Sequence, residues 1–118
     1  EGISYYRTLH DYRQLRDAAI EGKSALIIGG GFIGSEIAAS LRANKLAVTM
    51  IFPSSWLVSR VFPESLGRAL TEQYRAKGVE ILAGDIPISM ERVGAKAPRR
   101  ASPSPGWRRT SHTCPKPG

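Results

Sequence analysis

Residues 24–34 read SALIIGGGFIG, a short apolar run that passes directly into closely spaced glycines. The apolar run over Ser24–Ile28 is typical of a strand that is buried on both faces of a parallel sheet. Apolar residues then recur at helical spacing, which predicts a helix over Phe32–Ala43. The glycines therefore lie where a strand turns into a helix.

The glycines fit the pattern G-x-G-x-x-G, which is weak alone but gains weight between a strand and a helix. In that setting Gly29 allows a tight turn, Gly31 lets a pyrophosphate approach the backbone, and Gly34 lets the helix pack closely on the strand. The N–H groups at the start of the helix then face the anion, and the helix dipole favours it. The pattern predicts a dinucleotide-binding turn, and the alternative is a glycine-rich turn that holds no ligand.

Helices and strands alternate along the rest of the chain as far as residue 82. A helix is predicted over Leu9–Glu21, a second strand over Ala47–Phe52, a third helix shortly after Pro63, and a third strand over Val79–Leu82. This order predicts the α/β class, with an incomplete Rossmann-like βαβαβ three-layer sandwich and a parallel sheet. We expect the Ser24–Ile28 strand to lie centrally in that sheet.

The formal charge of +7 is distributed unevenly along the 118 residues. Residues 1–85 hold ten Lys and Arg against nine Asp and Glu, whereas residues 86–118 hold seven against one and six of the eight prolines. Such a composition cannot bury enough apolar surface to offset chain entropy, so residues 93–118 are predicted to be a disordered basic tail. Two origins fit this tail: a change of reading frame near Gly94, or a natural basic extension.

Several classes of protein are excluded by composition. A single cysteine excludes an internal disulfide and a Cys-x-x-Cys redox pair. The apolar runs are far shorter than about 18 residues and no signal-peptide pattern is present, so we expect no membrane contact and a cytoplasmic location by default. The two histidines have no Cys, Asp or Glu partner at catalytic or metal-ligand spacing, so neither a catalytic residue nor a metal site is predicted in this chain.

The end of the second strand departs from the usual dinucleotide pattern. An acidic residue about 20 positions after the glycines ordinarily binds the ribose hydroxyls of NAD. Residues 51–56 read IFPSSW and contain no carboxylate. Ser54 and Ser55 can instead hydrogen-bond a ribose. Arg60 can reach a 2′-phosphate, which would favour NADP, and the alternative for Arg60 is an ordinary solvated side chain. The choice between NAD and NADP stays open.

The chain resembles the NAD(P)H-binding domain of the FAD-dependent pyridine nucleotide oxidoreductases, nearest the branch of apoptosis-inducing factor, ferredoxin reductases and rubredoxin reductases. The resemblance rests on ALIIGGGFIGSEIA at residues 25–38 and YRTLHDYRQLR at residues 6–16. It covers about residues 2–92. The expected organisation is a linker and helix over residues 1–23, a truncated NAD(P)H-binding domain over 24–92, and the tail over 93–118.

The resemblance implies a division of labour. In this family a separate domain holds FAD, NAD(P)H passes a hydride to the flavin, and the electrons continue to an acceptor such as a ferredoxin. The glycine motif that binds FAD is absent from this sequence, so we expect a fragment of such an oxidoreductase that is inactive alone. The alternatives are a dinucleotide-binding module without catalysis, and a nucleic-acid binder that acts through the tail; we favour the first interpretation and expect no nucleic-acid partner.

The cofactor-binding residues implied by motif and resemblance lie at the glycine turn and after the second strand. Glu36 matches a family glutamate that projects toward the nicotinamide amide, and the alternative is an acid favoured only by the helix dipole. The predicted set is Gly29, Gly30, Gly31, Phe32, Ile33, Gly34, Glu36, Phe52, Ser54 and Arg60.

Overall fold

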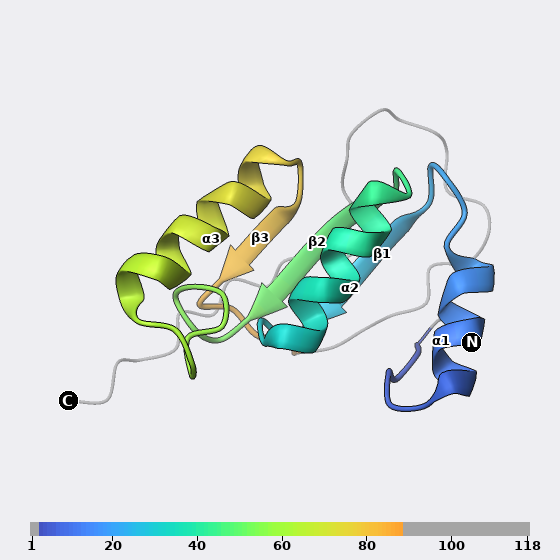
Figure 1. The fold of residues 1–118 in the computed structure, drawn as a ribbon, viewed down its shortest axis with the longest axis horizontal. Helices are drawn as coiled ribbons and strands as arrows, with labels where there is room; N and C mark the ends of the chain where they lie inside the picture. Colours follow the sequence, from blue (N-terminus) through green and yellow to red (C-terminus); the bar gives the residue numbers. More distant parts are fainter. Residues whose placement is uncertain (1–2, 89–118) are drawn as a thin grey trace.

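A computed structural model describes residues 3–88, in which three parallel strands alternate with three helices (Figure 1). In chain order the elements are α1 (Leu9–Ala18), β1 (Ser24–Ile28), α2 (Phe32–Ala43), β2 (Ala47–Phe52), α3 (Glu64–Ala76) and β3 (Glu80–Ala83). The α/β class and the parallel sheet are confirmed. The predicted tail over residues 93–118 lies outside the described residues, and the division into domains stays a prediction.

The strand in the middle of the sheet is β2, which pairs with β1 on one side and β3 on the other. Met50 of β2 pairs with Ile27 of β1 and with Ile81 of β3. The prediction that β1 lies centrally is therefore wrong for the described strands. In a complete doubly wound sheet further strands pair beyond β1, but a single βαβαβ unit has the order 3-2-1, with its second strand in the middle.

Alternate residues of the strands point toward α2 and α3 and form the core. In Figure 1 α2 crosses in front of the sheet and α3 lies alongside β3, and residues of both helices pack into one apolar cluster. The buried members of that cluster are Ala38, Leu41, Leu46, Val48, Met50, Phe52, Leu57, Val58, Val79 and Ile81. The described residues thus supply the sheet and one helix layer of the predicted sandwich.

The two crossover helices end in the same hydrogen-bonded motif. After α3, Gly78 adopts φ +88 and the N–H of Val79 donates to the carbonyl of Tyr74 at 3.1 Å. After α2, Lys45 at φ +63 takes the position that glycine usually holds in this motif. Because Val79 closes the helix, β3 begins at Glu80, one residue later than predicted.

A capping box starts α1. The N–H of Asp11 donates to Thr8 Oγ1 at 3.2 Å, and the N–H of Thr8 donates to Asp11 Oδ2 at 2.8 Å. The N–H of Arg7, and after it the hydroxyl and N–H of Thr8, hold the pKa of Asp11 below its ordinary value of 3.8. The helix ends at Ala18, earlier than predicted, because the chain turns through Gly22 at φ +81 to enter β1.

Candidate functional site

The turn between β1 and α2 depends on glycine at two positions for reasons internal to the protein. Gly29 adopts φ +125, which L side chains rarely adopt, while its N–H donates to the carbonyl of Ile51 at 2.9 Å. A Cβ on Gly34 would lie 2.5 Å from the carbonyl oxygen of Gly29. Only glycine therefore lets α2 approach the end of β1 so closely.

Gly31 meets no such internal requirement. Its φ of −84° is open to any residue, and a Cβ there would find no heavy atom within 4 Å. Gly31 is the N-cap of α2, and the first N–H groups of a helix have no partners within the helix itself. Their partial positive charge favours an anion at this place. The open space over Gly31 suits a group that must come close to the backbone.

Gly30 and Phe52 support the turn from the core side. A Cβ on Gly30 would lie 2.6 Å from Cγ of Phe52, so the ring packs directly against the glycine. Phe52 is only 2% exposed. Its ring therefore belongs to the core. Phe52 can affect ligand binding only indirectly, by holding the glycine turn in position.

Phe32 and Ile33 lie exposed in the first turn of α2. The ring of Phe32 meets the ring of Phe62 edge to face, with centroids 5.6 Å apart. Ile33 lines a broad hollow of about 630 Å³ together with residues 6–9 and Tyr12. A ligand on the glycine turn would have this partly apolar hollow beside it.

Glu36 is exposed and lies beyond the first turn of α2, which contains no acidic residue. The helix dipole acts mainly within the first turn, so it explains a glutamate at this position poorly. Burial, and secondly the charge of Glu36, raise the pKa of Tyr74 above its ordinary 10.0. The hydroxyl of Tyr74 donates to the carbonyl of Ser35 at 2.9 Å, so α3 contacts α2 beside Glu36.

Ser54 and Arg60 lie in the segment between β2 and α3. The hydroxyl of Ser54 donates to the carbonyl of Trp56 at 3.0 Å. Its proton is therefore used within the loop, which leaves the oxygen as an acceptor for a ribose hydroxyl. Arg60 is exposed.

The carboxyl ends of β2 and β3 are joined at this edge of the sheet. The N–H of Gly84 donates to the carbonyl of Ser54 at 2.9 Å, and the N–H of Asp85 donates to that of Phe52 at 3.1 Å. Asp85 thus follows the end of β3 directly beside the end of β2. No motif marked Asp85 beforehand, because its place depends on the pairing of two strands far apart in sequence.

The segment after β2 also returns to the glycine turn, which no sequence pattern indicated. The N–H of Val58 donates to the carbonyl of Gly30 at 2.7 Å. The two residues are too far apart in sequence for any local periodicity to report their contact.

Within residues 3–88 no group of three or more His, Cys, Asp or Glu is arranged to hold a metal ion. In the same part of the chain, none of the helices combines the length and apolar character needed to cross a membrane.

The family described as pyridine nucleotide-disulphide oxidoreductase matches residues 1–94. The chain belongs to this family. Its members related to this chain are FAD-dependent oxidoreductases that use NAD(P)H.

Two curated relatives and one solved structure illustrate the similarity. Monodehydroascorbate reductase 4, peroxisomal, of Arabidopsis thaliana is 40% identical over 94 residues, covering 77% of this chain and 19% of the relative. Apoptosis-inducing factor 1, mitochondrial, of Dictyostelium discoideum is 35% identical over 89 residues, covering 71% and 17%. Putidaredoxin reductase, in a covalent complex with putidaredoxin, superposes with a TM-score of 0.75 at 28% identity, covering 78% and 22%.

These matches confirm the resemblance to the branch of apoptosis-inducing factor and ferredoxin reductases. The chain spans about a fifth of the length of the family members it matches. Since the names of these relatives place them in peroxisomes and mitochondria, the cytoplasmic location stays a prediction.

Proposed function

We propose that this chain is the NAD(P)H-binding portion of an FAD-dependent oxidoreductase that passes a hydride from NAD(P)H to flavin and electrons onward to an acceptor. The observation that supports this most strongly is the environment of Gly31. Glycine occupies a position where φ is ordinary and the space above is open. A ligand that approaches the backbone gives a reason for glycine there, and the protein's own packing gives none.

Each neighbouring group then has a definite part in binding. Gly29 and Gly34 allow the turn that presents the first N–H groups of α2 to the pyrophosphate. The hydroxyl oxygen of Ser54 accepts a hydrogen bond from a ribose hydroxyl. Glu36 is exposed on α2, and we propose that it projects toward the nicotinamide amide.

The flavin and the acceptor belong to the rest of the proposed oxidoreductase. FAD supplies the hydride-accepting ring when it is bound there. The acceptor that we propose is a small electron-carrier protein of the ferredoxin kind, because putidaredoxin reductase, a structural neighbour, is found in complex with putidaredoxin. We propose that the protein is located in the cytoplasm.

A second candidate is a dinucleotide-binding module without its own catalysis. All the site residues assigned in this sequence are assigned to dinucleotide binding and none to catalysis, as this candidate requires. Both candidates predict that the purified chain by itself shows no flavin absorbance and does not oxidise NADH. A bound yellow flavin would contradict the interpretation as a fragment, because the sequence holds one glycine motif.

Titration of the full chain with NADH, followed by nucleotide fluorescence, tests the site. Gly31→Ala places a methyl group where the pyrophosphate must approach, so we expect at least roughly tenfold weaker binding, about 1.4 kcal/mol. Ser40→Ala is the matched control, because it changes an exposed position near the other end of α2 and should leave affinity unchanged.

Truncation after Gly94 completes the test. Exposed charges more than about 8 Å away are screened at physiological salt, so removal of the basic tail should leave affinity nearly unchanged. If truncation abolishes binding while Gly31→Ala does not, binding is electrostatic and the glycine turn is not the site.

Comparison of NADH with NADPH assigns Arg60. A selective loss of NADPH affinity in Arg60→Gln would place a 2′-phosphate near this side chain. Equal affinities before and after the change would leave Arg60 an ordinary solvated residue.

A further inference from the structure

Val58 adopts a backbone conformation that β-branched residues rarely take, with φ +55. Such a conformation costs free energy and persists only where its surroundings hold it in place. The side chain of Val58 is 4% exposed in the core. Its carbonyl accepts the N–H groups of Val61 and Phe62 at 3.0 and 2.9 Å, and its own N–H donates to Gly30 at 2.7 Å. The strained residue therefore bends the loop back onto the glycine turn.

The bond from Val58 fixes more than the carbonyl that it reaches. The carbonyl of Gly30 and the N–H of Gly31 belong to one planar peptide unit, and none of the described peptide bonds is cis. In a trans peptide these two groups point in opposite directions. Because the N–H of Val58 holds the carbonyl of Gly30, the N–H of Gly31, the N-cap of α2, points away from Val58.

Thr71 of α3 holds the residue that precedes Val58. Its Oγ1 accepts the N–H of Leu57 at 2.9 Å and donates to the carbonyl of Gly67 at 2.7 Å. Thr71 is 3% exposed and Leu57 is fully buried. The position of α3 is thereby transmitted through Leu57 and Val58 to the glycine turn.

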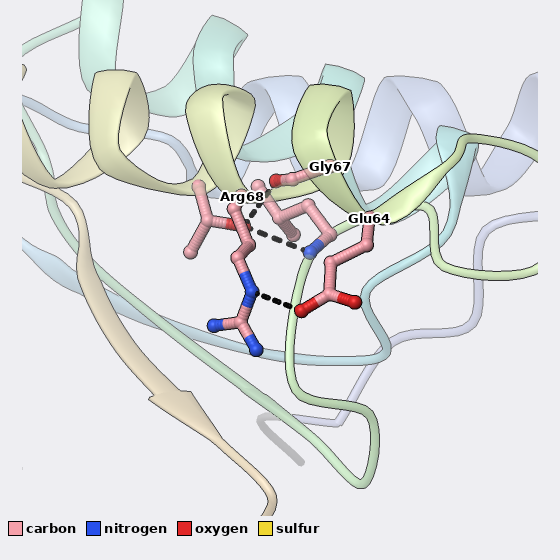
Figure 2. A network of polar contacts seen from close by, with 5 residues as sticks. Glu64, Gly67 and Arg68 are labelled. Carbon is pink, nitrogen blue, oxygen red and sulfur yellow. Dashed lines mark hydrogen bonds and ion pairs between the residues drawn. The ribbon is translucent and has the colours of Figure 1, made fainter.

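A second contact seats the same loop on α3 one turn earlier. A Cβ on Gly67 would lie 2.0 Å from Cδ1 of Trp56, so the indole packs directly on the helix backbone. The guanidinium of Arg68 lies 5.2 Å from the centroid of the same ring. Figure 2 shows Arg68 and Glu64 reaching toward one another beside Gly67, where their side chains form a 2.7 Å ion pair.

We infer that Thr71 and Val58 are positioning residues for the dinucleotide, because they aim the N–H of Gly31 at the phosphate through the carbonyl of Gly30. This inference rests on the proposed function of the glycine turn. Neither residue contacts the ligand, and both act through the orientation of one peptide unit. The hydrogen bond from Leu57 to Thr71 and the hydrogen bond from Val58 to Gly30 together form what we call the latch.

Three threonine variants of the full chain test the latch. Thr71→Val replaces the hydroxyl by a methyl group of similar shape, whereas Thr71→Ser keeps the hydroxyl. Thr49→Val is the matched control, because Thr49 is also a buried threonine, 6% exposed, whose hydroxyl donates to Glu80 at 2.9 Å and takes no part in the latch. The readouts are amide hydrogen exchange at Val58, the amide chemical shift of Gly31, and NADH affinity.

We expect Thr71→Val to speed exchange at Val58, shift the Gly31 amide, and weaken NADH binding by roughly three- to tenfold. Thr71→Ser should restore all three readouts, and Thr49→Val should leave them as in the wild type. The inference is overturned if both valine variants change the Gly31 amide chemical shift and the NADH affinity equally, because equal changes indicate a general loss of stability.

Two further results keep the inference distinct from the proposed function. If the wild type does not bind NADH, the proposed function fails, while exchange at Val58 and the Gly31 shift still decide whether the latch exists. If Thr71→Val does not fold, the wild type decides alone: a Val58 amide that exchanges as fast as an open loop overturns the latch, and one as slow as the strand amides supports it.

Discussion

Replacement of Gly34 by alanine would test the close approach of α2 to β1. The new Cβ would lie 2.5 Å from the carbonyl oxygen and 3.3 Å from the carbonyl carbon of Gly29, and 3.4 Å from Cγ2 of Ile27. Ordinary contact begins at 3.4 Å, so the helix or the turn must move by about 0.9 Å. The obstacle is a backbone oxygen, so the turn cannot relieve the clash by rotating a side chain.

The cost of this shift can be bounded. Overpacking of this kind costs about 1–3 kcal/mol. Alanine recovers up to about 1 kcal/mol because it favours the helix more than glycine does. Because the obstacle is a backbone oxygen, the overpacking cost lies in the upper part of that range, about 2–3 kcal/mol, and we expect the free energy of unfolding to fall by about 1–2 kcal/mol. For a domain of this size, that loss lowers Tm by roughly 4–16 °C.

Urea unfolding followed by circular dichroism measures the effect. Gly31→Ala is the control within the same turn, because its Cβ meets open space and its φ is ordinary. It should lose less than about 1 kcal/mol, the cost of alanine at an N-cap. A Gly34→Ala variant that is as stable as the wild type, or that loses no more than Gly31→Ala, would refute the steric argument.

Three further changes have expected outcomes in the same assay. Tyr74→Phe removes the bond to the carbonyl of Ser35 and should cost about 0.5–1.5 kcal/mol; no loss would show that the bond contributes nothing. Lys45→Gly relieves a left-handed residue and should stabilise the chain by about 0.5–1 kcal/mol despite loss of the exposed ion pair to Glu21; a loss of stability would contradict this. Asp11→Asn keeps an acceptor but not the charge. Because the pKa of Asp11 is lowered by folding, the wild type should be more stable than this variant above its ordinary value of 3.8, and the advantage should vanish as pH falls through the folded pKa. An advantage that does not decline as the pH is lowered below 3.8 would contradict it.

Much of the local structure could be predicted because its causes are local. Helical spacing of apolar residues predicted the bounds of α2, and the predicted start of α1 at Leu9 is confirmed, because the capping box of Thr8 and Asp11 that starts the helix is a local feature. The ends were less certain, because α1 stops where the chain must turn toward β1. Likewise, Val79 was predicted to begin the third strand, but its N–H closes the end of α3 instead.

The candidate site was predictable only in part. The glycine pattern names the turn, because the roles of Gly29 and Gly34 follow from backbone geometry within a few residues. It could not show that Phe52 is a core residue beneath the turn, since that depends on which face of β2 meets the helices. Nor could it show that Asp85 lies beside the end of β2.

The sequence by itself determined the element types, the parallel α/β class and the identity of the glycine turn, because periodicity and glycine geometry act over short stretches of chain. Only the tertiary structure decided that β2 lies in the middle of the sheet, and that Thr71 and Val58 hold the glycine turn. Those features are hydrogen bonds between segments far apart in sequence. They form when the packed core brings the segments together, so no local pattern encodes them.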